Sequence, residues 1–293
     1  MRVTEFQVFQ NSINFSNRAR ERMDRAAEVA TSGLRVHRPW DDPAAAGRIA
    51  TNRASQHQFN SISKTTAYAQ DQLQAADTAL GEVHDSLKYL RTIAVQMVND
   101  HLSAEERANA VLDVQHTRAS VINSLNRRIA GQFIFSGNLE DTPAFDATGT
   151  FTGDGGDRFT EIGPGVLQRV NIHAEDYVTA AAGGTDVFTV LADLEAALGA
   201  NDPVLIGDTL DGFDAVLTQV STGRAEAGGI QNILLAAEES SEIVADNNMV
   251  TVGRLADADM IDAATELSKA QTALNAALTA TARSFELNLL DKL

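Results

Sequence analysis

Apolar side chains recur every three or four residues along most of the chain. From residue 59 to residue 97 the two steps alternate without interruption. A spacing that averages 3.5 residues places these side chains on one seam of a helix, the pattern of a coiled coil. The seam residues are Phe59, Ile62, Thr66, Ala69, Leu73, Ala76, Leu80, Val83, Leu87, Leu90, Ala94 and Met97. The sequence therefore predicts one long helix that packs along this seam.

The start of the long helix is marked by Asp41, Asp42 and Pro43. A carboxylate can accept hydrogen bonds from the free N–H groups of a first helical turn, and proline fits that turn because its missing N–H is not needed there. We predict that these three residues form the helix cap. The helix should run from about residue 43 to about residue 100, a length of roughly 85 Å.

A second helix should begin after Ser103, because Ser103 and Glu106 form a capping box. Its predicted seam is Ala108, Val111, Gln115, Arg118, Ile122, Leu125 and Ile129. The C-terminal third shows a seam of Leu210, Phe213, Leu217 and Val220, which continues after a phase slip near Gly228 and Gly229 as Ile230, Leu234, Ala237, Ser241 and Val244.

Both ends of the chain carry an amphipathic stripe. The front stripe is Phe6, Phe9, Ile13, Ser16, Arg20, Met23, Ala27, Ala30 and Leu34, and the back stripe is Met260, Leu267, Leu274, Leu278, Phe285 and Leu289. Exposed phenylalanines and leucines are unfavourable in a monomer and usually mark a binding surface. The alternative is that the two termini simply pair into an ordinary bundle. The candidate assembly residues are Phe6, Phe9, Ile13, Met23, Leu34, Leu267, Leu274, Leu278, Phe285, Leu289 and Leu290.

Between the helical segments lies a glycine-rich insert. Residues 131–184 contain ten glycines and two prolines, whereas residues 44–130 contain two glycines and no proline. This composition is typical of a small β lobe with many turns. Residues 153–156 read as a turn, since the carboxylate spacing of a calcium loop and the lysine of a phosphate loop are both missing.

Charge and composition exclude several functions. Lys and Arg number 23 and Asp and Glu number 40, which gives a net charge of −17 and argues against binding nucleic acid or an anionic membrane. The chain has no cysteine and no apolar run of about 18 residues, so we expect no membrane insertion. The N-terminus also lacks the apolar core of a Sec-type signal peptide.

The basic residues are concentrated near the front. Residues 1–60 carry nine arginines against six acidic residues, a net of +3. This stretch is either a solvated helix face or a surface that meets acidic surfaces of neighbouring copies, and charge patterning alone does not separate the two.

No motif for catalysis is present. The six histidines show no HExxH or HxH spacing, and no Gly-x-Ser-x-Gly sequence occurs. Asp41 and Asp42 could be an acid–base pair, but a helix cap before proline explains these two residues with fewer assumptions. We therefore expect no enzymatic activity, no cofactor and no metal.

Five stretches carry a resemblance to a known family. They are residues 31–45 (TSGLRVHRPWDDPAA), 131–137 (GQFIFSG), 151–156 (FTGDGG) with 162–165 (IGPG), 264–274 (ATELSKAQTAL) and 289–293 (LLDKL). On these residues the chain resembles the flagellin superfamily, and in detail its hook–filament junction proteins. Trp40 departs from the small polar residue expected at its position.

The resemblance implies a mainly α, elongated flagellin-like fold. Residues 1–40 and 260–293 would form a terminal coiled coil, residues 41–138 and 189–259 a helical shaft, and residues 139–188 a small β-rich outer domain. It implies a structural protein that joins the flagellar hook to the filament, secreted through the flagellar type III apparatus. The implied partners are hook-associated protein 1, flagellin, a flagellar export chaperone and further copies of the chain in a ring. A minor filament flagellin is the alternative, and a hydrolase on a helical scaffold is the alternative from another class.

Overall fold

The structure, a computed structural model, describes residues 2–290. The side chains of residues 2–6, 8, 9 and 284–290 lie outside the described set. The chain forms two compact units, one of residues 1–58 with 244–293 and one of residues 59–243. The three-part division expected from the sequence stays a prediction.

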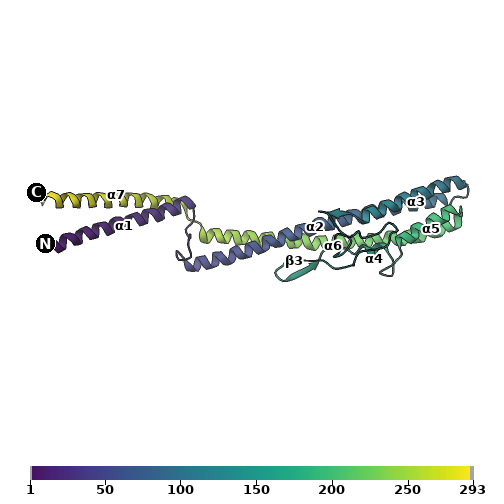
Figure 1. Cartoon of the computed structure of the whole chain (residues 1–293), viewed down its shortest axis with the longest axis horizontal. Coiled ribbons are helices and arrows are strands. Elements are labelled where there is room, and N and C mark those ends of the chain that lie inside the picture. The colour runs from purple at the N-terminus through teal and green to yellow at the C-terminus, as the bar shows by residue number, and fades with distance from the viewer. Residues whose placement is uncertain (1, 291–293) are drawn as a thin grey trace. The chain divides into compact units, whose positions relative to one another are not determined.

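The chain is mainly helical (Figure 1). Its helices are α1 (Arg2–Ser32), α2 (Pro43–Met97), α3 (Ala104–Leu125), α4 (Ala174–Val178), α5 (Val187–Gly199), α6 (Pro203–Ala256) and α7 (Met260–Leu290). Its strands are β1 (Arg128–Ile129), β2 (Gln132–Phe133), β3 (Phe159–Gly163) and β4 (Val166–Arg169). The predicted mainly α fold with a small β region is confirmed. No helix among the described residues has an apolar stretch long enough to cross a bilayer.

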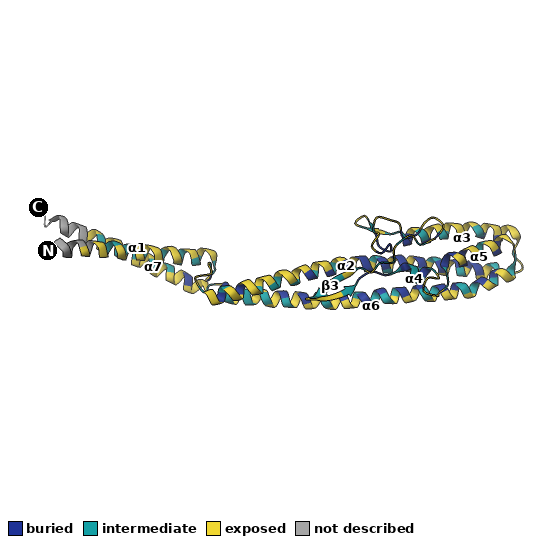
Figure 2. Ribbon diagram, turned by 60° about the horizontal axis from the view of Figure 1, so that its bottom comes forward, coloured by how far each residue is buried: buried dark blue, intermediate teal, exposed yellow. Residues whose placement is uncertain are grey.

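The predicted long helix and its seam are confirmed in α2. Every seam residue from Ile62 to Ala94 is buried, while Phe59 and Met97 are half-buried. Helix α6 lies alongside α2 (Figures 1 and 2), and paired side chains join the two. Arg91 Nε donates to Asp214 Oδ1 at 2.7 Å, and Arg224 Nε donates to Asp77 Oδ1 at 2.9 Å.

The capping box of α3 is confirmed, and its predicted seam is confirmed only in part: Leu125 is buried, and Val111, Ile122 and Ile129 pack half-buried against the core. Ser103 Oγ accepts from the Glu106 backbone N–H, and the Glu106 side chain accepts from the Ser103 N–H. The buried face is Arg107, Ala110, Val114, Val121, Ser124 and Leu125. Gln115 is exposed and donates to Glu195 at 2.6 Å, so the predicted seam lies partly at the surface.

The buried face of α3 includes Arg107, which is only 3% exposed. Its guanidinium donates to the carbonyls of Met97 and Asn99 and to Asn201 Oδ1. These bonds tie the α2–α3 turn to the α5–α6 turn. They satisfy the guanidinium of Arg107 and so allow a charged side chain to be buried. A search for the spacing of apolar residues does not detect such a position.

The phase slip predicted near Gly228 is also wrong, because α6 is continuous and its buried face runs through small residues. Gly223 and Ala227 continue the three–four spacing between Val220 and Ile230. A Cβ on Gly223 would come within 2.7 Å of the Tyr177 ring, so this position requires glycine. The sequence reading followed only large side chains and missed the small ones.

The insert packs into the same core as the helices. β1 pairs with β2 and β3 with β4, both antiparallel, in two separate two-stranded sheets. Phe135, Phe145 and Ile172 from the insert are buried in one cluster with Leu80 of α2 and Leu191 of α5. Figure 2 shows this buried region where the insert meets the helices.

Candidate assembly surface

Helices α1 and α7 pack against each other as an antiparallel pair. The half-buried side chains of α1 step by three or four residues, as do those of α7. The facing residues are Ser12, Ser16, Ala19, Met23, Ala26 and Ala30 on α1, and Ala263, Leu267, Ala270, Leu274, Ala277 and Thr281 on α7. The pair is therefore a two-stranded coiled coil with many small residues.

This pair buries little. Among the side chains that the structure describes in α1, none is buried, and in α7 Ala263 alone is. Phe15 is 63% exposed and Ile261 is 79% exposed. Apolar surface of this kind, left open along two helices, favours contact with other chains.

The predicted assembly residues occupy three kinds of position. Those half-buried in the terminal pair or at its base are Ile13, Met23, Leu34, Leu267 and Leu274. Leu278 lies off the facing seam and is 44% exposed. The side chains of Phe6, Phe9, Phe285, Leu289 and Leu290 lie outside the described residues. The structure thus brings the described members to one pair of helices.

The base of the pair is fixed by backbone contacts with the end of α6. Gly33, at φ 73°, accepts a hydrogen bond from Ala258 N at 2.8 Å, and Arg35 N donates to Ala256 O at 2.6 Å. A small apolar cluster follows directly, made of Val36, Ala45, Ile49 and Ala256. Positive φ favours glycine, which explains the Ser-Gly step in the sequence.

Asp41 and Asp42, which precede α2, form different hydrogen bonds. Asp42 Oδ1 accepts from the Ala45 backbone N–H at 3.0 Å, the geometry of an N-cap before Pro43. This bond is the main reason why the pKa of Asp42 lies below its usual value. Asp41 was grouped with it as a cap, but its carboxylate accepts from the backbone N–H groups of His37 and Arg38. Asp41 therefore holds the preceding loop rather than the helix.

Trp40 is the exposed tip of that loop. It is 72% exposed, and the Arg38 guanidinium lies 5.7 Å from the ring centroid. The contact is a cation–π interaction at a solvent-facing site.

A groove of about 420 Å³ runs along one side of the base of the α1–α7 pair. It is lined by apolar side chains, including Ala26 and Val29 of α1. Asp262 and Glu266 of α7 and Arg25 of α1 line it as well. The groove thus combines an apolar lining with charges of both signs.

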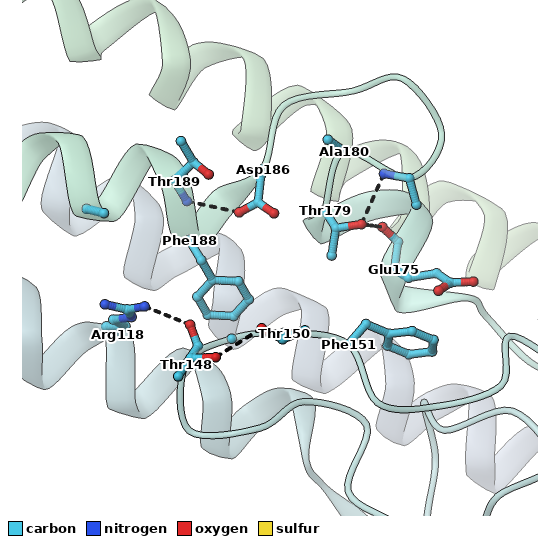
Figure 3. A pocket seen from close by; sticks show the side chains of 13 residues that line it. Arg118, Thr148, Thr150, Phe151, Glu175, Thr179, Ala180, Asp186, Phe188 and Thr189 are labelled. Carbon is cyan, nitrogen blue, oxygen red and sulfur yellow. Dashed lines mark hydrogen bonds between the residues drawn. The ribbon is translucent and has the colours of Figure 1, made fainter.

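A larger open hollow, of about 700 Å³, lies at the insert (Figure 3). The polar groups in it hold local structure. Arg118 donates to the Thr148 carbonyl at 2.7 Å, and Asp186 caps α5 through the Thr189 N–H at 2.9 Å. Burial raises the pKa of the Glu175 carboxyl, with Asp176 adding to the shift. This arrangement orders the insert and contains no nucleophile–base pair.

Sequence reasoning missed the residues that line the groove. The stripe search followed large apolar side chains, so it passed over Ala263, Ala270 and the charged flank of α1. A second scan for charges repeated every three or four residues would have found Arg18, Arg22 and Arg25.

Comparisons with known proteins agree with this architecture. The family model for the bacterial flagellin N-terminal helical region matches residues 6–139, and that for the bacterial flagellin C-terminal helical region matches residues 210–293. Flagellin FlaB1 of Treponema pallidum is 26% identical over 245 residues, covering 83% of this chain and 82% of that protein. Flagellar hook-associated protein 3 of Salmonella typhimurium is 24% identical over 246 residues, covering 80% and 77%.

A solved structure shares the fold. It is that of a protein assigned as a flagellar hook-associated protein from Vibrio parahaemolyticus, with a TM-score of 0.68 at 22% identity over 74% of this chain and all of that chain. Since the two flagellin models together span most of the sequence, the chain belongs to the flagellin family of bacterial flagellar structural proteins.

Proposed function

We propose that this protein joins the flagellar hook to the filament. The observation that carries the proposal is the α1–α7 pair, whose apolar seam is half-open in one chain and needs further chains to close it. The likeness to hook-associated protein 3 of Salmonella typhimurium and to the Vibrio parahaemolyticus structure supports the junction position.

The proposed partners follow from that position. Hook-associated protein 1 lies on the hook side and flagellin on the filament side, while further copies of this chain complete a ring. A flagellar export chaperone covers the α7 stripe before the chain is secreted through the type III apparatus. The protein acts without a cofactor and as a structural element, not an enzyme.

A minor filament flagellin is the second candidate, and the likeness to flagellin FlaB1 favours it. A deletion strain separates the two. Loss of a junction protein leaves hooks without filaments and releases flagellin into the medium, whereas loss of a minor flagellin leaves filaments attached.

The stripe itself is tested by Leu274→Asp combined with Leu278→Asp. These side chains belong to α7 and are not part of the core of residues 59–243, so that core should stay folded. We expect a soluble protein that neither binds the chaperone nor supports a filament in the deletion strain. A double variant that builds filaments of normal length would refute the assembly role of this stripe. Leu112→Ala, at an exposed position of α3, is the matched control.

A further inference from the structure

The two units of the chain differ in net charge. Residues 59–243 contain 10 basic and 27 acidic residues, so they carry the whole net charge of −17. Residues 1–58 with 244–293 contain 13 of each and are neutral. Copies of the larger unit repel one another, whereas copies of the smaller unit do not. Electrostatics therefore favours self-association through the unit that contains α1 and α7.

Within the smaller unit the charges are separated again. Residues 1–58 carry nine basic and six acidic residues, and residues 244–293 carry four basic and seven acidic ones. The N-terminal part is thus +3 and the C-terminal part −3. One copy can therefore offer its basic N-terminal part to the acidic C-terminal part of another.

The basic charges form a stripe on α1. Arg18, Arg22 and Arg25 are exposed at steps of four and three residues, with the exposed Phe15 one step before them. Within the part of the chain that the structure describes, no carboxylate forms an ion pair with any of the three arginines. We define Phe15, Arg18, Arg22 and Arg25 as the basic stripe.

The acidic charges form a matching row on α7. Asp259, Asp262 and Glu266 line the groove at steps of three and four residues. Asp259 also caps α7, accepting from Ile261 N at 2.8 Å, and Glu266 pairs with Lys269 at 2.8 Å. These three residues are the acidic row.

The chain's own register brings one arginine, Arg25, level with the acidic row. Gly33 is level with Ala258, so counting along the antiparallel helices places Arg25 level with Glu266 and Arg22 level with Lys269. A shift of seven residues, about 10 Å along the axis, aligns all three arginines with all three carboxylates. A second copy can supply that shift.

We propose that the basic stripe of one copy docks on the acidic row beside the groove of a second copy. This rests on the self-association included in the proposed function. In the contact, Arg18 faces Glu266, Arg22 faces Asp262 and Arg25 faces Asp259. The two surfaces lie on different helices, so the contact is heterologous and repeats in one direction, as a ring or a helical array requires.

Cysteine cross-linking in assembled flagella tests the contact, because the chain has no cysteine of its own. A full-length chain with Arg22→Cys and Asp262→Cys is expressed in the deletion strain, and its flagella are oxidised. We expect disulfide-linked dimers and larger multimers. The control combines Arg20→Cys, on the opposite flank of α1, with Asp262→Cys and should remain monomeric. Monomers alone from the Arg22 pair would overturn the docking.

A charge exchange gives a second readout. Arg22→Glu alone and Asp262→Arg alone each place like charges across the contact, so each should reduce incorporation into flagella by about tenfold or more. Co-expression of both variants should restore it where the two variants alternate, since a contact between unlike copies joins Glu to Arg or Arg to Asp. Normal incorporation of either single variant, or no rescue on mixing, would overturn the docking.

Both results are distinguishable from failure of the proposed function. That function fails if the deletion strain keeps attached filaments, or if the unaltered chain is absent from isolated flagella. If Arg22→Glu lowers flagellin binding and co-expressed Asp262→Arg does not restore incorporation, the stripe binds flagellin, and the docking between copies is wrong.

Discussion

The α1–α7 pair and the core of residues 59–243 share one sequence period but differ in burial. In α2 the seam residues Leu73, Leu80 and Leu87 are at most 1% exposed. In α7 the equivalent Leu267 and Leu274 are only half-buried. The α2 seam packs against α6, α3 and the insert in one core. Helix α1, in contrast, packs against α7. A heptad pattern therefore indicates which face of a helix packs. The number of neighbouring elements decides how completely that face is buried.

The largest expected effect lies in the enclosed seam. Leu87→Ala should lower the free energy of unfolding by about 2–5 kcal/mol, because a fully buried leucine leaves both lost contacts and a cavity. Leu274→Ala should cost the isolated chain much less, since its side chain is already half-exposed. Urea unfolding of both variants measures the difference. Equal losses would contradict the contrast between the two regions.

A second effect concerns pH and the half-buried carboxyl of Glu175. Burial raises the pKa of this group, so folding favours its protonated form. Its contribution to stability is therefore unfavourable above the raised pKa and disappears as the pH falls to the ordinary carboxyl range. Glu175→Gln should raise the melting temperature at pH 7, with the gain closing toward pH 4.

Calorimetry across this pH range checks the sign for Glu175. Glu82→Gln is the matched control, because hydrogen bonds from Arg127 and Ser124 lower the pKa of Glu82. Its substitution should destabilise the protein at pH 7 and matter less in acid. A change in melting temperature of the same sign for both variants at pH 7 would contradict this prediction.

A smaller effect is expected at the N-cap of α2. Asp42→Ala should lower the melting temperature slightly, because the Ala45 N–H loses its acceptor. Asp42→Asn keeps an acceptor oxygen and should change less. Unchanged thermal unfolding together with failed assembly would mean that Asp42 contacts another copy instead.

The sequence predicted the parts of the fold that rest on strong local signals. The uninterrupted spacing specifies the buried face of α2, and the Ser103–Glu106 capping box specifies the start of α3. The buried face of α3 could not be predicted, because it depends on Arg107 bonding to carbonyls of two distant turns. The continuous seam of α6 was hidden because Gly223 and Ala227 carry no large side chain.

The candidate surface was predicted in outline only. The apolar stripes identified the two helices that pair in the structure, since large side chains dominate a periodicity search. Leu278 lies off the seam that faces α1, and Arg18, Arg22 and Arg25 became meaningful only once the register of α1 against α7 was known. Register is set by tertiary contacts such as Gly33 with Ala258, which no local pattern contains.

Hydrogen exchange on the free chain and on assembled flagella tests the central claim that assembly completes the α1–α7 pair. The account predicts fast exchange at the Met23 and Leu274 amides in the free chain and strong protection in flagella. The Leu80 and Leu87 amides should be protected in both states, since their burial is complete within one chain. Equal protection of Met23 and Leu87 in the free chain would contradict the claim.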